Sequence, residues 1–130
     1  MAFTKILIVD DSDTLRIQLK NLLYESRYEV LEGSHGLDGL GKAQANRDLD
    51  LIICDFNMPE MDGITMSKKV REISGLHDVP IFMLTTESTA ELKALGKEAG
   101  IMAWIVKPYN AEKLKGVIEK VLKMPRKGSV

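Results

Sequence analysis

Runs of four or five apolar residues recur along this chain, separated by longer segments of mixed polarity. Such unbroken runs are typical of strands that are buried on both faces of a parallel sheet. A weaker candidate strand at residues 29–33 contains polar residues. The four apolar runs are residues 6–9, 51–54, 81–84 and 102–106.

The intervening segments have apolar residues at helical spacing. The second predicted helix is short, and its predicted inner face comprises Leu37, Leu40 and Gln44. The inner faces of the last two helices are predicted to be Leu92, Leu95, Gly96 and Ala99, and then Leu114, Val117, Ile118, Val121 and Leu122. Five strands that alternate with five helices predict an α/β fold, in which right-handed crossovers place helices on both faces of a parallel sheet. The pattern alone does not give the order of the strands.

Four of the predicted strands end at residues that carry chemistry. Asp10 and Asp11 follow the first strand, Asp55 the third, Thr85 the fourth and Lys107 the fifth. In a parallel sheet these ends share one edge, where open α/β proteins bind their ligands. Two carboxylates about 5 Å apart repel each other by roughly 3 kcal/mol at an effective dielectric constant near 20. Protonation of one carboxyl or a bound cation relieves this repulsion, and oxygen ligands at a solvent-facing edge suit Mg²⁺.

Together these residues give the chain a resemblance to a known family. Residues 4–123 resemble the receiver domain of bacterial two-component response regulators, most closely the single-domain CheY-like type. The motifs are the acidic pair, Asp55 with the loop of residues 56–63, Thr85, and Lys107 followed by proline, all in this order. The resemblance implies a doubly wound five-stranded sheet of order 2-1-3-4-5 with five helices, as in flavodoxin. It also implies a receiver domain at residues 1–123 and a short polar tail at 124–130.

The resemblance implies a role for each residue at this edge. Asp55 is the phosphoacceptor and takes a phosphoryl group from a histidine kinase in a Mg²⁺-dependent reaction. Thr85 and Lys107 contact the transferred group, and the family holds the peptide bond after Lys107 cis. The implied ligands of Mg²⁺ are Asp11 and Asp55 through their side chains, Asn57 through its backbone carbonyl, and Asp10 mainly through water.

The implied output is a conformational switch, without enzymatic activity beyond self-catalysed phosphorylation and dephosphorylation. Thr85 moves toward the phosphoryl group, and the aromatic residue of the last strand, here Trp104, follows it inward. Asn57 and Glu87, which lie beside the approach of the attacking water, tune the rate of dephosphorylation. The fourth helix, last strand and last helix bind the downstream target. Four lysines suit an acidic partner on this face: Lys93, Lys97, Lys113 and Lys120.

Alternative functions remain open at this point. Val117 stands where the best-known chemotaxis proteins present a lysine to the flagellar motor switch, which weakens the case for that target. The chain is alternatively a phosphorelay intermediate whose partner is a phosphotransfer protein. A third hypothesis is a small phosphatase with Asp11 as nucleophile, but it leaves Asp55 without a role. Residues 36–43 nearly match a phosphate-binding P-loop, yet Ala43 replaces the Ser or Thr that holds magnesium.

Composition and charge narrow the classes further. The chain has 18 basic and 19 acidic residues and a formal net charge of −1, so no basic field indicates nucleic acid. No apolar run approaches the length of a membrane span, and the first residues are not a signal peptide. We therefore expect a cytoplasmic protein without membrane insertion. Cys54 lies in an apolar run and is expected to be a buried, inert thiol, and His35 and His77 lack the spacing of metal ligands.

Overall fold

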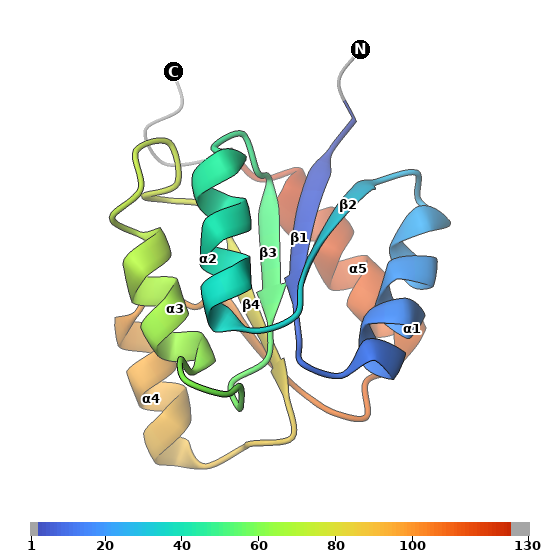
Figure 1. The fold of residues 1–130 in the computed structure, drawn as a ribbon. Helices are drawn as coiled ribbons and strands as arrows, with labels where there is room; N and C mark the ends of the chain where they lie inside the picture. The colour runs from blue at the N-terminus through green and yellow to red at the C-terminus, as the bar shows by residue number, and fades with distance from the viewer. Residues whose placement is uncertain (1–2, 126–130) are drawn as a thin grey trace.

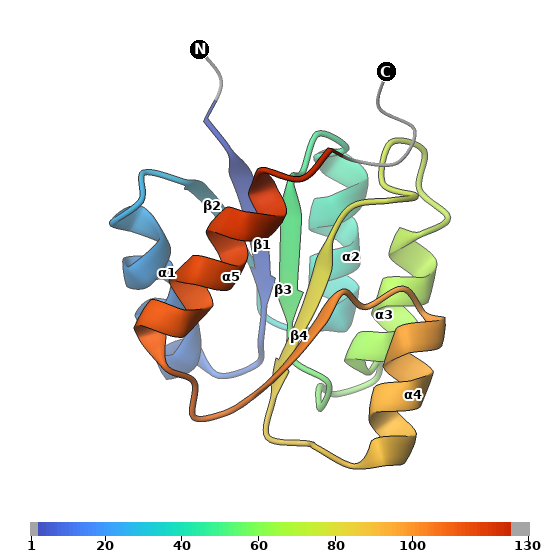
Figure 2. The same ribbon diagram turned by 180° about the vertical axis from the view of Figure 1, so that it is seen from behind.

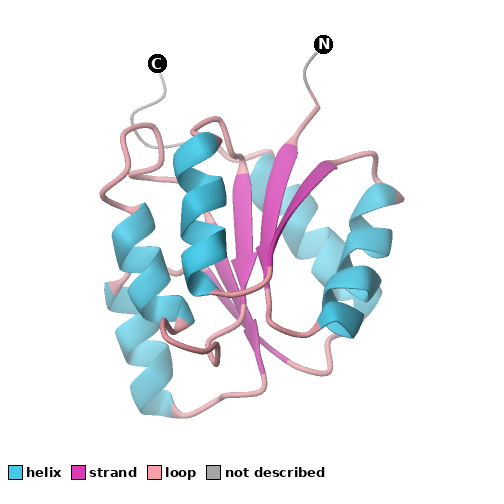
Figure 3. Ribbon diagram, viewed as in Figure 1, coloured by secondary structure: helices cyan, strands magenta, loops and turns pink. Residues whose placement is uncertain are grey.

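The apolar runs become neighbouring strands of one parallel sheet, with the order β2-β1-β3-β4-β5. The computed structural model describes residues 3–125. The strands are β1 (Lys5–Val9), β2 (Glu29–Gly33), β3 (Leu51–Cys54), β4 (Ile81–Thr85) and β5 (Ala103–Val106). The helices are α1 (Asp13–Tyr24), α2 (Gly36–Ala45), α3 (Gly63–Val70), α4 (Ala90–Glu98) and α5 (Ala111–Leu122). The predicted fold class and strand order are therefore confirmed (Figure 3).

The sheet separates two apolar cores. Successive residues of a strand point to opposite faces, so Ile6 and Ile8 pack with α1 and α5, whereas Leu7 and Val9 pack on the other side. Figure 1 shows α2 and α3 in front of the sheet, and Figure 2 shows α1 and α5 covering the opposite face. The three central strands are covered on both sides, which explains why their sequences are almost entirely apolar.

The inner face of α2 differs from the prediction. Leu37 is 47 % exposed and Gln44 is also exposed, and the helix instead buries Gly36, Gly39 and Ala43. Two of these residues are glycines: Gly39 allows the helix backbone to approach Val9 of β1, and Gly36 allows it to approach Met61. A hydropathy pattern searches for large apolar side chains and therefore missed this small-residue face.

Two further predicted core positions are also exposed. Leu95 in α4 is 46 % exposed and Val117 in α5 is 38 % exposed, although both lie at helical spacing with buried neighbours. Leu114, Ile118 and Val121 are buried as predicted. An amphipathic stripe is wider than the part of a helix that a single sheet covers, so its margins reach solvent.

The ends of the helices are fixed by local hydrogen bonds. Ser12 is the N-cap of α1 and accepts a bond from the backbone N–H of Leu15 at 3.3 Å. His35 is the N-cap of α2, and its Nδ1 accepts from the N–H of Asp38 at 3.1 Å. The sequence did not indicate this capping role for His35. Of the predicted tail, residues 126–130 lie outside the described part of the chain.

Two glycines of α2 provide a direct test of this packing. A Cβ atom at Gly39 would lie 2.7 and 2.8 Å from the two Cγ atoms of Val9, whereas a Cβ at Gly41 would meet nothing within 4 Å. We expect Gly41→Ala to raise the free energy of unfolding by about 0.5–1 kcal/mol, because alanine favours a helix. Gly39→Ala should lower it by about 1–3 kcal/mol through overpacking. Urea unfolding of both variants measures this, and equal midpoints would contradict the close approach of α2 to β1.

Candidate functional site

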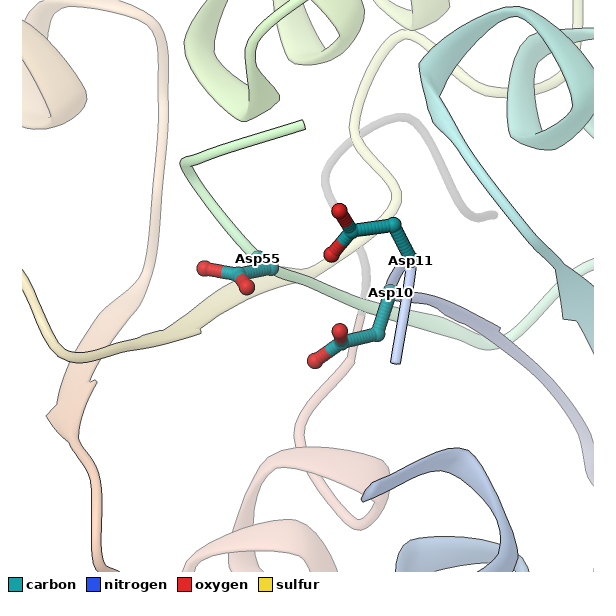
Figure 4. Close-up of side chains that lie close together, drawn as sticks. All are labelled: Asp10, Asp11 and Asp55. Atoms are coloured by element: carbon teal, nitrogen blue, oxygen red, sulfur yellow. The ribbon is translucent and has the colours of Figure 1, made fainter. Parts of the chain in front are cut away.

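The sheet brings the acidic residues of two strands together. In the register of the sheet Val9 of β1 lies opposite Cys54 of β3, so the residues that follow them, Asp10 and Asp55, emerge side by side. One ligand atom from each of Asp10, Asp11 and Asp55 lies within 4.8 Å of those of the other two, and Figure 4 shows these side chains gathered at the strand ends. Asp10 is only 9 % exposed, Asp55 is half-buried and Asp11 is exposed.

Lys107 supplies the positive charge of this site. Its Nζ lies 2.7 Å from Oδ2 of Asp10 and 3.3 Å from Oδ2 of Asp55. The Lys107 side chain is 10 % exposed, so both ion pairs are largely shielded from solvent. It reaches this position from the end of β5, where the peptide bond to Pro108 is cis, as the family resemblance implied. Asp10 is also held by the backbone N–H of Ser12, which donates to its Oδ1 at 2.9 Å.

Asp55 has one carboxylate oxygen that is not engaged. Its Oδ1 is buried and accepts no hydrogen bond within the described residues. A buried carboxylate oxygen without a partner is costly, and three carboxylates near a single ammonium leave the site with an excess of negative charge. Both features fit a hard divalent cation such as Mg²⁺, which takes carboxylate oxygens and retains several waters.

The loop after Asp55 depends on its final glycine. A Cβ atom at Gly63 would lie 2.3 Å from the backbone oxygen of Asp55, so only glycine allows α3 to begin so close to the end of β3. The N–H of Gly63 donates to the oxygen of Phe56 at 2.9 Å, and Asp62 caps α3 by accepting from the N–H of Thr65 at 2.8 Å. This places Asn57 near the acidic site in a short, closed loop.

Thr85 and Trp104 lie on neighbouring strands, and both bond the backbone of Glu87 in the loop after β4. Thr85 is fully buried, and its hydroxyl oxygen accepts from the N–H of Glu87 at 3.3 Å. Trp104 is partly buried, and its indole N–H donates to the backbone oxygen of Glu87 at 2.8 Å. The side chain of Glu87 in turn accepts from the amide of Asn57 at 2.7 Å. The sequence indicated each of these residues, but not that Glu87 joins them.

Sequence reasoning missed a supporting arginine. The guanidinium of Arg16 donates to the backbone oxygen of Asp10 and to the carboxylate of Asp13, and its Nε lies 3.3 Å from Oε1 of Glu32. Lys20 holds the second oxygen of Glu32 at 2.9 Å. Arg16 therefore fastens the β1–α1 loop to β2. The signal in the sequence that could have indicated this arginine was Glu32. It is a charged residue within a predicted strand, and a partly buried charge requires a partner.

Cys54 behaves as predicted. It is buried directly before Asp55, and burial raises the pKa of its thiol to about 12. The reactive thiolate is therefore suppressed at neutral pH, and the packing of this side chain is its main contribution.

The fold and the site define the class of the protein. A parallel sheet of order 2-1-3-4-5 carries an acidic triad, a hydroxyl and a lysine at one edge, and a cis peptide bond follows the lysine. Residues 6–119 match the model of the response regulator receiver domain, and the chain belongs to this family. Receiver domains typically bind Mg²⁺ at such an acidic site.

Individual relatives are chemotaxis proteins. The chain is 44 % identical to chemotaxis protein CheY1 of Helicobacter pylori over 119 residues, covering 91 % of this chain and 96 % of that protein. It is 40 % identical to the chemotaxis protein CheY homolog of Campylobacter jejuni, over 91 % of this chain and 92 % of that one. The structure of chemotaxis protein CheY4 of Vibrio cholerae superposes with a TM-score of 0.87 at 42 % identity, over 92 % of this chain and 99 % of that one.

Within residues 3–125, no helix has the length and apolar character that crossing a membrane requires.

The excess negative charge leads to a prediction about Asp11. Lys107 pairs with Asp10 and Asp55, whereas Asp11 is exposed and makes no ion pair with that lysine. We expect Asp11→Asn to stabilise the metal-free protein by about 1 kcal/mol, because it removes a repulsion that solvent partly screens. Millimolar Mg²⁺ should raise the unfolding midpoint of the wild type, by preferential binding to the native state, and should raise that of the variant less.

Urea unfolding with a chelator and with Mg²⁺ measures both effects. Glu98→Gln is the control, because it removes an exposed charge from the C-terminal end of α4, opposite to the end that follows the β4–α4 loop. Identical midpoints for the wild type and Asp11→Asn in both conditions would rule out an acidic cation site of the kind described above.

Proposed function

We propose that this protein is a stand-alone chemotaxis-type response regulator, phosphorylated on Asp55 by a histidine kinase in a Mg²⁺-dependent reaction in the cytoplasm. The observation that carries the proposal is the environment of Asp55. One of its carboxylate oxygens accepts no hydrogen bond within the described residues, and the other lies 3.3 Å from Nζ of Lys107. The carboxylates of Asp10 and Asp11 lie close enough to share one metal ion with Asp55. The similarity to the chemotaxis proteins CheY1 and CheY4 supports the signalling role.

The proposed reaction is an in-line transfer of a phosphoryl group from a histidine to Asp55. A carboxylate oxygen of Asp55 attacks phosphorus, the P–N bond of a phosphohistidine breaks, and the imidazole leaves with the electron pair of that bond. Mg²⁺ held by Asp10, Asp11, Asp55 and the backbone carbonyl of Asn57 would neutralise charge on the transferred oxygens. Lys107 contributes a compact positive charge to the product, and the hydroxyl of Thr85 has a proton to donate to it.

Asp55 suits the role of nucleophile better than Asp11, the residue that the phosphatase hypothesis requires. Lys107 contacts Asp55, which is 12 % exposed at its side chain, so the interaction between ammonium and phosphoryl oxygen is partly shielded from water. Asp11 is exposed. A phosphorelay role uses the same acceptor and differs only in the partner, a phosphotransfer protein in place of a terminal target.

The output surface is the face formed by α4, β5 and α5. Leu95, Met102, Val106 and Val117 are between 38 % and 49 % exposed there. Lys93, Lys97, Lys113 and Lys120 are exposed on the same helices. Exposed apolar residues rimmed by positive charges suit a partner with an apolar face and acidic flanks. Val117 stands on this face where the best-known chemotaxis proteins present a lysine to the flagellar motor switch, so that switch is only one candidate partner among others.

Mass spectrometry of the intact protein tests the phosphoacceptor. Incubation with acetyl phosphate and Mg²⁺ should add one phosphoryl group to the wild type and none to Asp55→Asn, because the amide is not nucleophilic. Thr85→Ala should still be modified, since the hydroxyl contacts the product and does not form the bond. Phosphatase turnover that persists in Asp55→Asn would instead assign the chemistry to Asp11.

Emission from Trp104 tests the switch at constant Mg²⁺. The protein has one tryptophan, and its indole is bonded to the loop that follows Thr85. Modification with beryllofluoride should change the maximum or intensity of emission, because Thr85 moves toward the mimic and carries this loop with it. Thr85→Ala should lose most of that change. An unchanged spectrum in fully modified wild-type protein would show that Trp104 is a fixed core residue.

A further inference from the structure

Glu87 stands at the centre of a hydrogen-bonded chain that runs from the acidic site to β5. Its carboxylate accepts from the side-chain amide of Asn57 at 2.7 Å, and its backbone oxygen accepts from the indole of Trp104 at 2.8 Å. Asn57 lies two residues after Asp55, whereas Trp104 lies inside the last strand. A single residue therefore contacts both the loop beside the acids and the aromatic residue of β5.

The indole is held from two sides, so it is sensitive to movement of this loop. A Cβ atom at Gly96 of α4 would lie 2.8 Å from Cζ3 and 3.1 Å from Cε3 of Trp104, so the ring lies directly against the helix backbone. Its N–H is bonded to Glu87 on the other side. Displacement of the Glu87 backbone must stretch that bond or shift the ring along Gly96.

We propose that Glu87 is a positioning residue that couples cation binding to Trp104, so that Mg²⁺ alone changes the environment of the indole before any phosphoryl transfer. The inference rests on one part of the proposed function, the metal site formed by the acidic residues and the carbonyl of Asn57. The coupling passes through the side chains of Asn57 and Glu87. It does not require movement of Thr85, whose hydroxyl accepts from the backbone N–H of Glu87 and not from its side chain.

The physical cause is that the cation and the side chain of Glu87 compete for Asn57 in the loop after Asp55. A cation that draws the Asn57 carbonyl toward the acids also displaces its side-chain amide, which is fastened to Glu87 by a charge-assisted hydrogen bond. The coupling is reciprocal, because two binding events that share one equilibrium affect each other equally. The indole bond resists this displacement, so loss of the indole N–H should strengthen Mg²⁺ binding, even though Trp104 touches none of the carboxylates.

The experiment titrates unphosphorylated protein with MgCl2 and records Trp104 emission, with calorimetry of the same samples to establish that Mg²⁺ binds. Five proteins are compared: the wild type, Thr85→Ala, Glu87→Ala, Glu87→Gln and Glu91→Ala. Glu87→Gln loses the charge but keeps an oxygen that accepts from Asn57. Glu91→Ala is the matched control, because it removes an exposed carboxylate from the first turn of α4.

We expect a saturable change in emission in the wild type, Thr85→Ala, Glu87→Gln and Glu91→Ala, and its loss in Glu87→Ala. Trp104→Phe, measured by calorimetry alone, should bind Mg²⁺ about fivefold more tightly than the wild type, at the low end of couplings between sites. An unchanged spectrum in wild-type protein that binds Mg²⁺ would overturn the coupling. So would an emission change that persists in Glu87→Ala.

The outcomes separate this inference from the proposed function. Absence of Mg²⁺ binding in calorimetry would contradict the metal site on which both depend. Binding with a silent indole would overturn the coupling alone and leave phosphorylation of Asp55 intact. Conversely, a coupled indole in a protein that acetyl phosphate fails to modify would support the coupling and contradict the proposed phosphotransfer.

Discussion

The concentration of like charge at one edge of the sheet is the constraint on which the rest of the structure depends. Asp10, Asp11 and Asp55 lie within reach of one cation, and Lys107 is the cation of the described chain that contacts two of them. Such a cluster persists only when the backbone that carries it is held by other interactions. The central strands provide them, because β1 and β3 are buried on both faces and their carboxyl ends have little freedom to separate.

Two of the supporting contacts hold the backbone of the site and not its carboxylates. Arg16 donates a hydrogen bond to the backbone oxygen of Asp10 and not to its carboxylate. Gly63 allows the Asp55 backbone and the start of α3 to approach closely without occupying the space above the site. The negative charge that these contacts preserve is unfavourable for the isolated fold and favourable for a divalent cation. Stability and cation binding are therefore linked through the same three side chains.

Three loops surround this edge of the sheet and have different roles. The β1–α1 loop carries acids whose positions are fixed by Ser12, Arg16 and Lys107. The β3–α3 and β4–α4 loops carry Asn57 and Glu87, which contact each other and the indole of Trp104. Hydrogen bonds between loops are easier to shift than strands packed between two helical layers. A change at the acids is thus transmitted through the loops, and the sheet serves as the fixed frame.

Much of this protein was determined by its sequence alone. Unbroken apolar runs predicted the buried strands, because a parallel sheet covered by helices leaves no polar face, and acids, hydroxyl and lysine at their ends predicted one shared edge. Leu37 and Gln44 were wrongly placed inside, because hydropathy does not recognise a helix that packs through Gly36 and Gly39. The contact of Arg16 with Glu32 and the contacts of Glu87 with Asn57 and Trp104 were decided only by the tertiary structure. Each of these contacts joins residues that are distant along the chain, and local periodicity carries no information about such pairs.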